Sequence, residues 1–225
     1  MSWFIARYRP TALFSLKSSR ATSTVGRSLP IPTQYAVKMA LIDAGLRVGR
    51  VSNPESLVRA LAATEVRIGV PEDACITGTI QKIRQEPKNP SPETPYIANI
   101  ALREVVFIRG VLQAAFHREA CPPEVRELAP LVNHFGKRGG FVQYEGALDA
   151  DELDESFTIE PVQHGPIPPA FHLSTLDDFG PGARWEALNS FSPAPMKRDR
   201  DRIWREVLIP LGLYNVGAGF AHYRR

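Results

Sequence analysis

The amino-acid sequence predicts an α+β fold whose core elements follow the ferredoxin-like order of strand, helix, strand, strand, helix and strand. Two segments, residues 34–45 and 122–136, place apolar residues at helical spacing. Short segments in which apolar and polar residues alternate precede, separate and follow these two helices. A short additional helix and a proline-rich arm are inserted into this order.

The first core helix has the clearest start. Pro30 and Pro32 keep the approach extended and Thr33 is a favourable N-cap, so the helix should begin near Gln34. We expect Gly45 to end it. Residues 3–8 are apolar and β-favouring and predict the strand before the helix, with a long, partly extended loop over residues 11–29.

The middle of the chain predicts the extra helix and the arm. Asn53 and Pro54 are an N-cap and a first helical residue, which start a short helix. Residues 65–70, 74–85 and 100–108 alternate as strands do. The four prolines of residues 86–95 cannot join a strand ladder, so we interpret them as the tip of a projecting β-hairpin, a thumb over about residues 71–101. A disordered loop is the alternative.

The second core helix opens at Pro122 and Pro123 and should end at Gly136, with a strand over residues 141–144 after it. Its apolar face is formed by Val125, Leu128, Val132 and Phe135. An acidic, turn-rich stretch over residues 149–160 then marks a boundary. We therefore predict a core domain over residues 1–148 and a small β-rich C-terminal region over residues 149–225.

Charge is distributed unevenly along the 225 residues. The formal net charge is only +3, but no acidic residue precedes Asp43, whereas six lysines and arginines do. This basic start would attract phosphate groups. It also resembles a mitochondrial transit peptide, although Pro10, Pro30 and Pro32 would interrupt the amphipathic helix that such a peptide needs.

Other patterns limit the class of protein. No apolar run approaches the roughly 20 residues of a membrane span. Cys75 and Cys121 are far apart and lack a CxxC pattern, which argues against a disulfide framework or a zinc site. We expect a soluble, cytoplasmic protein without a membrane partner.

Two segments combine the features of a phosphate site. One is the basic, hydroxyl-rich loop that runs into the first core helix, where unpaired N–H groups and the positive end of the helix dipole face the loop. The other is residues 136–140, in which glycines let backbone N–H groups approach a phosphate beside two cations. The candidate residues are Lys17, Arg20, Ser23, Thr24, Arg27, Ser28, Thr33, Lys38, Lys137, Arg138, Gly139 and Gly140. An ordinary capped helix and an ordinary glycine turn are the structural alternatives.

No catalytic motif stands out. The sequence contains no GxxxxGK[ST], HExxH or GxSxG pattern, so it gives no support for nucleotide hydrolysis, a metal centre or a nucleophilic serine, and we expect no cofactor. His134 precedes the second anion loop by two residues and is the best acid/base candidate. Histidines at helix ends more often simply pack there.

The strand over residues 3–8, the RSLPIPTQYAVKMALIDAG segment and the HFGKRGGFVQY segment resemble the CRISPR-associated RAMP family numbered five. The resemblance covers about the first 145 residues. The proline-containing helix entry over residues 29–33 is its most recognisable part. Members of this family cap the foot of type I Cascade complexes, which serve antiviral defence.

The resemblance implies an RRM-like RAMP core with a thumb that hooks the 5′ handle of the guide RNA (crRNA), so the candidate residues above would bind RNA. It also implies contacts with the backbone RAMP subunits and the large subunit, and with target DNA only through the complex. One subtype cleaves precursor guide RNA without metal, using a Tyr, Lys and His constellation with neighbouring Lys and His. This sequence contains no Lys-His or His-Lys pair.

Three functions therefore compete at the level of sequence. The first is a structural RNA-binding subunit that does not act as an enzyme. The second is a metal-independent ribonuclease on the same scaffold, in which a His or Tyr deprotonates the 2′-hydroxyl and a Lys or Arg stabilises the phosphorane. The third is an imported mitochondrial protein whose N-terminal segment is removed.

Overall fold

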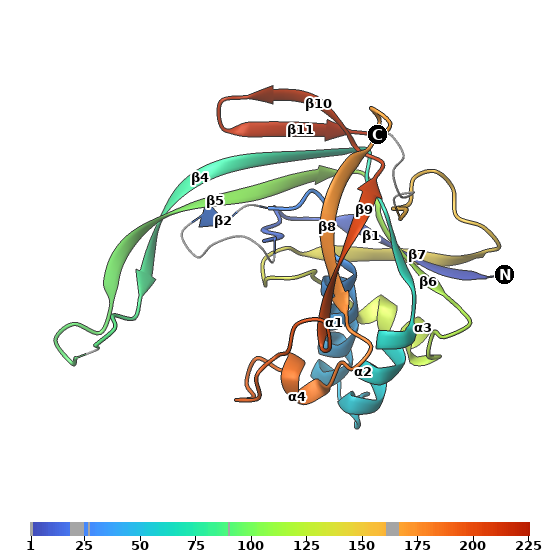
Figure 1. Ribbon diagram of the computed structural model, residues 1–225, viewed down its shortest axis with the longest axis horizontal. Helices are drawn as coiled ribbons and strands as arrows, with labels where there is room; N and C mark the ends of the chain where they lie inside the picture. Colours follow the sequence, from blue (N-terminus) through green and yellow to red (C-terminus); the bar gives the residue numbers. More distant parts are fainter. Residues whose placement is uncertain (1, 19–24, 27, 90, 161–166) are drawn as a thin grey trace.

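The computed structural model describes residues 2–18, 25–26, 28–89, 91–160 and 167–225. It confirms the α+β class, with mostly antiparallel strand pairs and few helices. Figure 1 shows a body of sheets and helices from which one long hairpin extends far to one side.

The first sheet has the strand order β3 (Val66–Gly69), β6 (Leu112–His117), β1 (Trp3–Pro10) and β7 (Val142–Ala150). All neighbouring strands in it are antiparallel. β1 begins with four apolar residues and lies in the interior of the sheet, with Phe4, Ala6 and Tyr8 buried. The Tyr8 hydroxyl donates a 3.0 Å hydrogen bond to the carbonyl of Ala129, so this buried polar group has a partner.

The second sheet is built on the projecting hairpin. It has the order β10 (Gly212–Gly217), β11 (Phe220–Arg224), β4 (Asp73–Gln85), β5 (Ile97–Arg109) and β2 (Val25–Gly26). β4 and β5 pair in one unbroken antiparallel register from Asp73 and Arg109 to Gln85 and Ile97, and β2 is parallel to β5. The end of the hairpin nearest the body is buried, whereas its distal part is exposed.

A third, two-stranded sheet pairs β8 (His172–Phe179) with β9 (Arg202–Ile209), and β8 packs on α1 (Figure 1). The C-terminal strands contact the rest of the fold at other places as well, because β8 also contacts α2 and β11 pairs with β4. The predicted boundary at residue 148 lies within β7. The division into two domains stays a prediction.

Helices α1 (Gln34–Arg47) and α2 (Pro54–Ala63) begin where the sequence predicts. The hydroxyl of Thr33 accepts a 3.1 Å hydrogen bond from the Ala36 N–H, and the side chain of Asn53 accepts one of 3.2 Å from the Ser56 N–H. Each bond satisfies a donor that the first helical turn leaves unpaired. None of the helices in the described ranges is long and apolar enough to cross a membrane.

Two predicted helix ends are wrong. α1 continues through Gly45, which is buried against Val51 and Leu128 and serves close packing, not termination. The second core helix does not reach Gly136. α3 (Glu124–Leu128) passes into a single 3₁₀ turn, η1 (Ala129–Leu131), because Pro130 has no N–H to continue the α-helical ladder. A further short helix, α4 (Trp185–Leu188), follows β8.

Candidate nucleic-acid interface

A groove of about 820 Å³ runs beside the N-terminal half of α1. Five parts of the chain line it: the loop around β2, α1 itself, β5 through Arg103, the loop between η1 and β7, and the C-terminal segments around α4 and β9. Its volume lies within the roughly 300–1,000 Å³ that is usual for ligand sites. The first turn of α1 carries no acidic residue, so its positive dipole end is not compensated there.

The loop over residues 136–140 is a closed turn. The Phe135 N–H donates to the Gly140 carbonyl and the Gly140 N–H donates to the Lys137 carbonyl, both at 3.2 Å. Gly139 has a φ of 113°, a left-handed conformation that favours glycine. Gly140 lies against the Phe14 ring, where a Cβ would come within 2.9 Å of Cδ1. The turn therefore buries Gly140 and leaves Lys137 and Arg138 exposed at the groove.

Charge in the groove is predominantly positive. Its acidic side chains, Asp43 and Asp177, are each paired with an arginine: the Arg47 Nε lies 2.8 Å from Asp43 Oδ2, and the Arg202 Nε lies 2.6 Å from Asp177 Oδ2. Five basic side chains line the groove, namely Lys17, Arg103, Lys137, Arg138 and Arg202. Because the two acids already have partners, the groove keeps an excess of positive charge for an anionic ligand.

The groove brings together four of the residues predicted from the sequence: Lys17, Thr33, Lys137 and Arg138. Gly139 is exposed beside them and Gly140 is buried. Ser28 is buried as well, and its hydroxyl accepts a 3.0 Å hydrogen bond from the Leu16 N–H, so it has a structural role. The remaining predicted loop residues, Arg20, Ser23, Thr24 and Arg27, lie outside the described ranges.

Lys38 does not suit the predicted role of RNA contact. Its side chain is fully buried, and its Nζ lies 2.8 Å from Asp178 Oδ1. Lys38 lies on the face of α1 that packs against β8, away from the groove lining. A cation that is buried and paired in this way has no charge to offer an external phosphate.

Sequence reasoning missed several residues of the groove. Arg103 comes from β5 and Tyr35 from α1. Phe191 lies in the segment that follows α4, and Arg202 lies in β9. Only the fold brings these distant positions together. The one local signal is Phe191, an isolated aromatic residue in the polar, proline-containing stretch NSFSPAP.

His134 lies in the groove with Lys137 and Arg138. Its Nδ1 is 2.9 Å from the side-chain oxygen of Asn133. Partial burial is the main cause that lowers the pKa of His134, and Arg47 and Arg138 lower it further, whereas Asp43 opposes the change. The imidazole is therefore neutral near pH 7.

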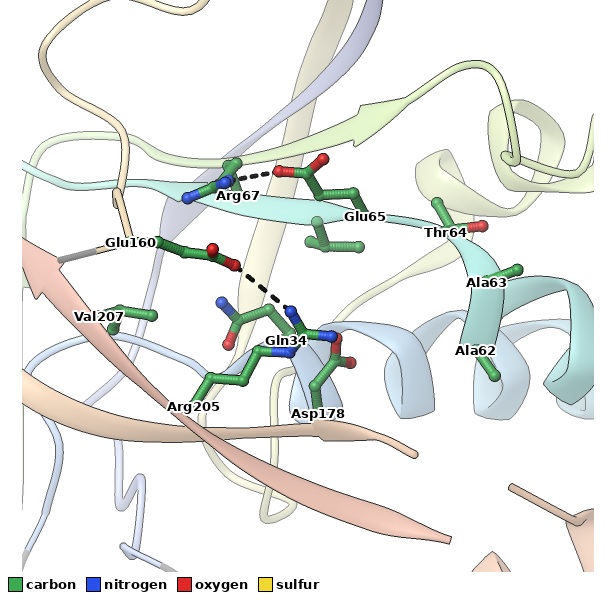
Figure 2. Close-up of a pocket in the computed structure, with 11 residues that line it drawn as sticks. Gln34, Ala62, Ala63, Thr64, Glu65, Arg67, Glu160, Asp178, Arg205 and Val207 are labelled. Carbon is green, nitrogen blue, oxygen red and sulfur yellow. Dashed lines mark hydrogen bonds and ion pairs between the residues drawn. The ribbon is translucent and has the colours of Figure 1, made fainter. Parts of the chain in front are cut away.

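A second hollow, of about 260 Å³, lies between α2, β3 and the C-terminal strands (Figure 2). Its two arginines are both paired: Arg67 with Glu65 at 2.7 Å and Arg205 with Glu160 at 3.3 Å, as Figure 2 shows. Asp178 adds a third acidic side chain to the lining. This hollow has no excess positive charge, so the larger groove is the better phosphate site. Within the described residues, no cluster of three or more His, Cys, Asp and Glu side chains could hold a metal ion.

Comparisons with known proteins give one sequence match. No family model matches the chain. A CRISPR-associated protein Cas5 from Archaeoglobus fulgidus is 27% identical over 108 residues, which are 48% of this chain and 47% of that protein. The match thus spans about half the length of the curated relative.

Two solved structures are similar at low identity. A crystal structure of a CRISPR protein from Archaeoglobus fulgidus has 9% identity and a TM-score of 0.44, covering 100% of this chain and 92% of that one. A chain of a CRISPR RNA-guided surveillance complex has 12% identity and a TM-score of 0.46, covering 93% and 90%. At these TM-scores neither structure establishes the fold. The sequence match confirms the resemblance that the motifs predict, and the chain is related to the CRISPR-associated Cas5 family.

Proposed function

We propose that this protein is a structural RNA-binding subunit of a type I CRISPR surveillance complex and that its groove holds the 5′ handle of the guide RNA. One observation carries the proposal: Lys17, Arg103, Lys137 and Arg138 converge on the groove beside the N-terminus of α1. Cations and helix N-termini bind phosphate oxygens, which position a nucleic acid without reading its sequence. The resemblance of the helix entry over residues 29–33 and of the HFGKRGGFVQY segment to a family that holds guide RNA supports the choice of RNA as the ligand.

The strand order supports a ferredoxin-like core. The chain order β1, α1, β3, β6, α3, β7 and the sheet order β3-β6-β1-β7 agree with that fold. The β4–β5 hairpin is inserted between β3 and β6, the place of the proposed thumb. In the proposed complex the protein would work in the cytoplasm, contact the backbone RAMP subunits and the large subunit, and meet target DNA only through the assembly.

The salt dependence of RNA binding tests the groove. Replacing both Lys137 and Arg138 with Ala removes two phosphate contacts, and each contact to single-stranded nucleic acid contributes about 0.7 to the slope of log K against log salt. The slope should therefore fall by about 1.4. Lys197 and Arg198 form the same dipeptide and are exposed but do not line the groove, so their double Ala variant is the matched control.

Two results of the salt experiment would contradict the proposal. One is an unchanged salt slope in the Lys137→Ala, Arg138→Ala variant, and the other is an equal loss in the control. Sequencing RNA that copurifies with the native complex gives an independent check, since the proposal expects guides that share one 5′ end. A native complex without RNA would also overturn it.

A second candidate function is metal-independent cleavage of precursor guide RNA in the same groove. The observation in its favour is that a neutral His134 lies in the groove with Lys137 and Arg138. A neutral imidazole can act as a general base on a 2′-hydroxyl, and cations can stabilise the phosphorane. The absence of a Lys-His pair in the sequence favours the binding function over cleavage.

A further inference from the structure

Phe191 is the most exposed large apolar residue of the described chain. Its exposed fraction is 95%, and it lines the positively charged groove. A phenyl ring held in water loses the stabilisation that burial would give, so this position needs an explanation other than folding. Exposed aromatic rings beside cations are the usual platform for unpaired nucleic-acid bases.

The segment that carries Phe191 is anchored to the body. The Phe191 N–H donates a 3.0 Å hydrogen bond to the side chain of Asn189, and the Ser192 N–H donates one of the same length to the Asn189 carbonyl. Just before this turn, Leu188 is buried, and the Trp185 N–H donates to Glu55 of α2 at 2.7 Å. The backbone that carries the ring is thus held by a hydrogen-bonded turn, which limits the entropy lost when a ligand binds.

Tyr35 also lines the groove, but its ring already contacts other side chains. The guanidinium carbon of Arg202 lies 4.1 Å from the centroid of Tyr35, and the Phe179 ring meets Tyr35 edge-on at 5.3 Å. Within the described ranges, no aromatic or guanidinium contact is made by Phe191. Tyr35 and the His134 imidazole are only partly exposed, so Phe191 is the ring of the groove that is best placed to receive a base.

We infer that the groove binds single-stranded RNA by stacking one unpaired base on Phe191 while Lys17, Lys137 and Arg138 hold the neighbouring phosphates. The inference rests on the proposed function and deepens it. In a duplex the base faces are stacked inside the helix and cannot reach a protein ring, so the groove should discriminate against double-stranded RNA. The positive charge of the lining favours this anionic ligand over an apolar protein segment.

The test uses the full chain and a short single-stranded RNA that carries 2-aminopurine at one position, moved along the strand in successive probes. Stacking quenches this base. Phe191→Ala should raise Kd about 5- to 150-fold and abolish the quenching at one position, without changing the salt slope. Phe191→Trp should preserve both signals. Phe107→Ala is the matched control, because Phe107 is 55% exposed on β5 but does not line the groove.

The outcomes separate the inference from the proposed function. If Phe191→Ala leaves Kd and fluorescence unchanged while the Lys137→Ala, Arg138→Ala variant weakens binding, stacking is wrong and the groove remains the RNA site. If neither variant weakens binding, both proposals fail. Equal binding of single-stranded and duplex RNA, or a loss in Phe191→Ala confined to contact with another subunit, would also overturn the inference.

Discussion

The ammonium nitrogen of Lys38 lies 2.8 Å from a carboxylate oxygen of Asp178, in the interface between α1 and β8. Burial lowers the pKa of Lys38 and raises the pKa of Asp178, although each charge opposes the change in the other. The pair thus connects the C-terminal strands to the first helix and depends on both partners.

Removing one partner of this ion pair should be costly. Lys38→Met leaves the Asp178 carboxylate buried without its counter-ion, and we expect the free energy of unfolding to fall by about 3–5 kcal/mol in urea denaturation. The double variant Lys38→Met, Asp178→Leu should recover most of this loss, because an apolar pair of similar volume needs no desolvated charge.

An exposed pair provides the comparison. Arg59 and Glu55 are one helical turn apart on α2, and the Arg59 side chain is 74% exposed. Arg59→Ala should change stability by only about 0.3–0.5 kcal/mol. Similar losses for Lys38→Met and Arg59→Ala would contradict the structural role of the buried pair.

Close packing at Gly45 gives a second prediction. A Cβ at this position would lie 2.4 Å from Val51 Cγ2 and 3.0 Å from Leu128 Cδ2. Gly45→Ala should therefore destabilise the protein by about 1–3 kcal/mol, even though alanine favours a helix interior. Adding Val51→Ala should relieve the clash, so the double variant should be more stable than Gly45→Ala alone. Thermal unfolding checks both, and a stabilised Gly45→Ala variant would show that Val51 moves freely.

The starts of α1 and α2 could be predicted from the sequence because a cap is a local device. Thr33 and Asn53 bond to N–H groups only three residues away. The end of α1 could not, because Gly45 faces Val51 and Leu128, and its role depends on tertiary packing. The end of α3 could have been predicted from the sequence, because Pro130 lies inside the apolar spacing of that helix and cannot continue it.

For the groove, too, residues marked by a local sequence pattern could be predicted, whereas residues brought together by the fold could not. Lys137 and Arg138 could be predicted because they follow a helix within one glycine-containing segment. Arg103 and Phe191 lie 88 residues apart in the numbering, and they share the groove only because β5 and the segment after α4 both reach it. Lys38 is a cation near the start of a helix, which suggests a phosphate contact, but its burial depends on where β8 packs.

RNA binding should strengthen at acid pH through His134. Its pKa is lowered mainly by burial, with Arg47 and Arg138 lowering it and Asp43 opposing them. A bound phosphate would raise this pKa again, so RNA binding takes up a proton, and affinity rises as pH falls through the pKa of His134 in the RNA complex. His134→Gln should flatten this rise in Kd measurements.

His172 provides the control for that experiment. Burial also lowers its pKa, but it does not line the groove, so His172→Gln should keep the wild-type pH profile of binding. The stability of the RNA-free protein, in contrast, decreases as pH falls. A histidine whose pKa is lower in the folded state than in the unfolded state destabilises the protein as pH falls below the unfolded-state pKa. RNA binding should therefore be measured at pH values above the midpoint of acid unfolding. An identical profile for wild type and His134→Gln would exclude this linkage.

Cleavage can be tested directly with precursor guide RNA in EDTA. We expect no specific cutting at the handle boundary, because the sequence lacks the neighbouring Lys-His pair of the cleaving subtype. A positioned general base typically contributes about 10² to 10⁴ in rate, so real activity would be easy to detect. Specific products that disappear in His134→Ala or Tyr144→Phe would establish the ribonuclease function instead.

The tip of the β4–β5 hairpin should serve assembly and not folding. Ile76, Val106 and Ile108 near the body are buried, whereas Ile80 and Ile100 farther out are 74% and 62% exposed. Residues 88, 89 and 91–93 are exposed, so deleting residues 88–93 should change the free energy of unfolding by less than about 0.5 kcal/mol. Ile108→Ala at the buried end should cost about 2–5 kcal/mol, which calibrates the measurement.

The same deletion should weaken incorporation into the RNA-guided complex, measured by copurification with the other subunits and the guide RNA. The exposed apolar face of the distal hairpin gives the physical reason, since such a surface on a soluble subunit is stabilised when a partner covers it. Full incorporation of the deletion variant would show that the tip has no part in assembly. A large fall in Tm of the isolated subunit would show that the tip contributes to the core.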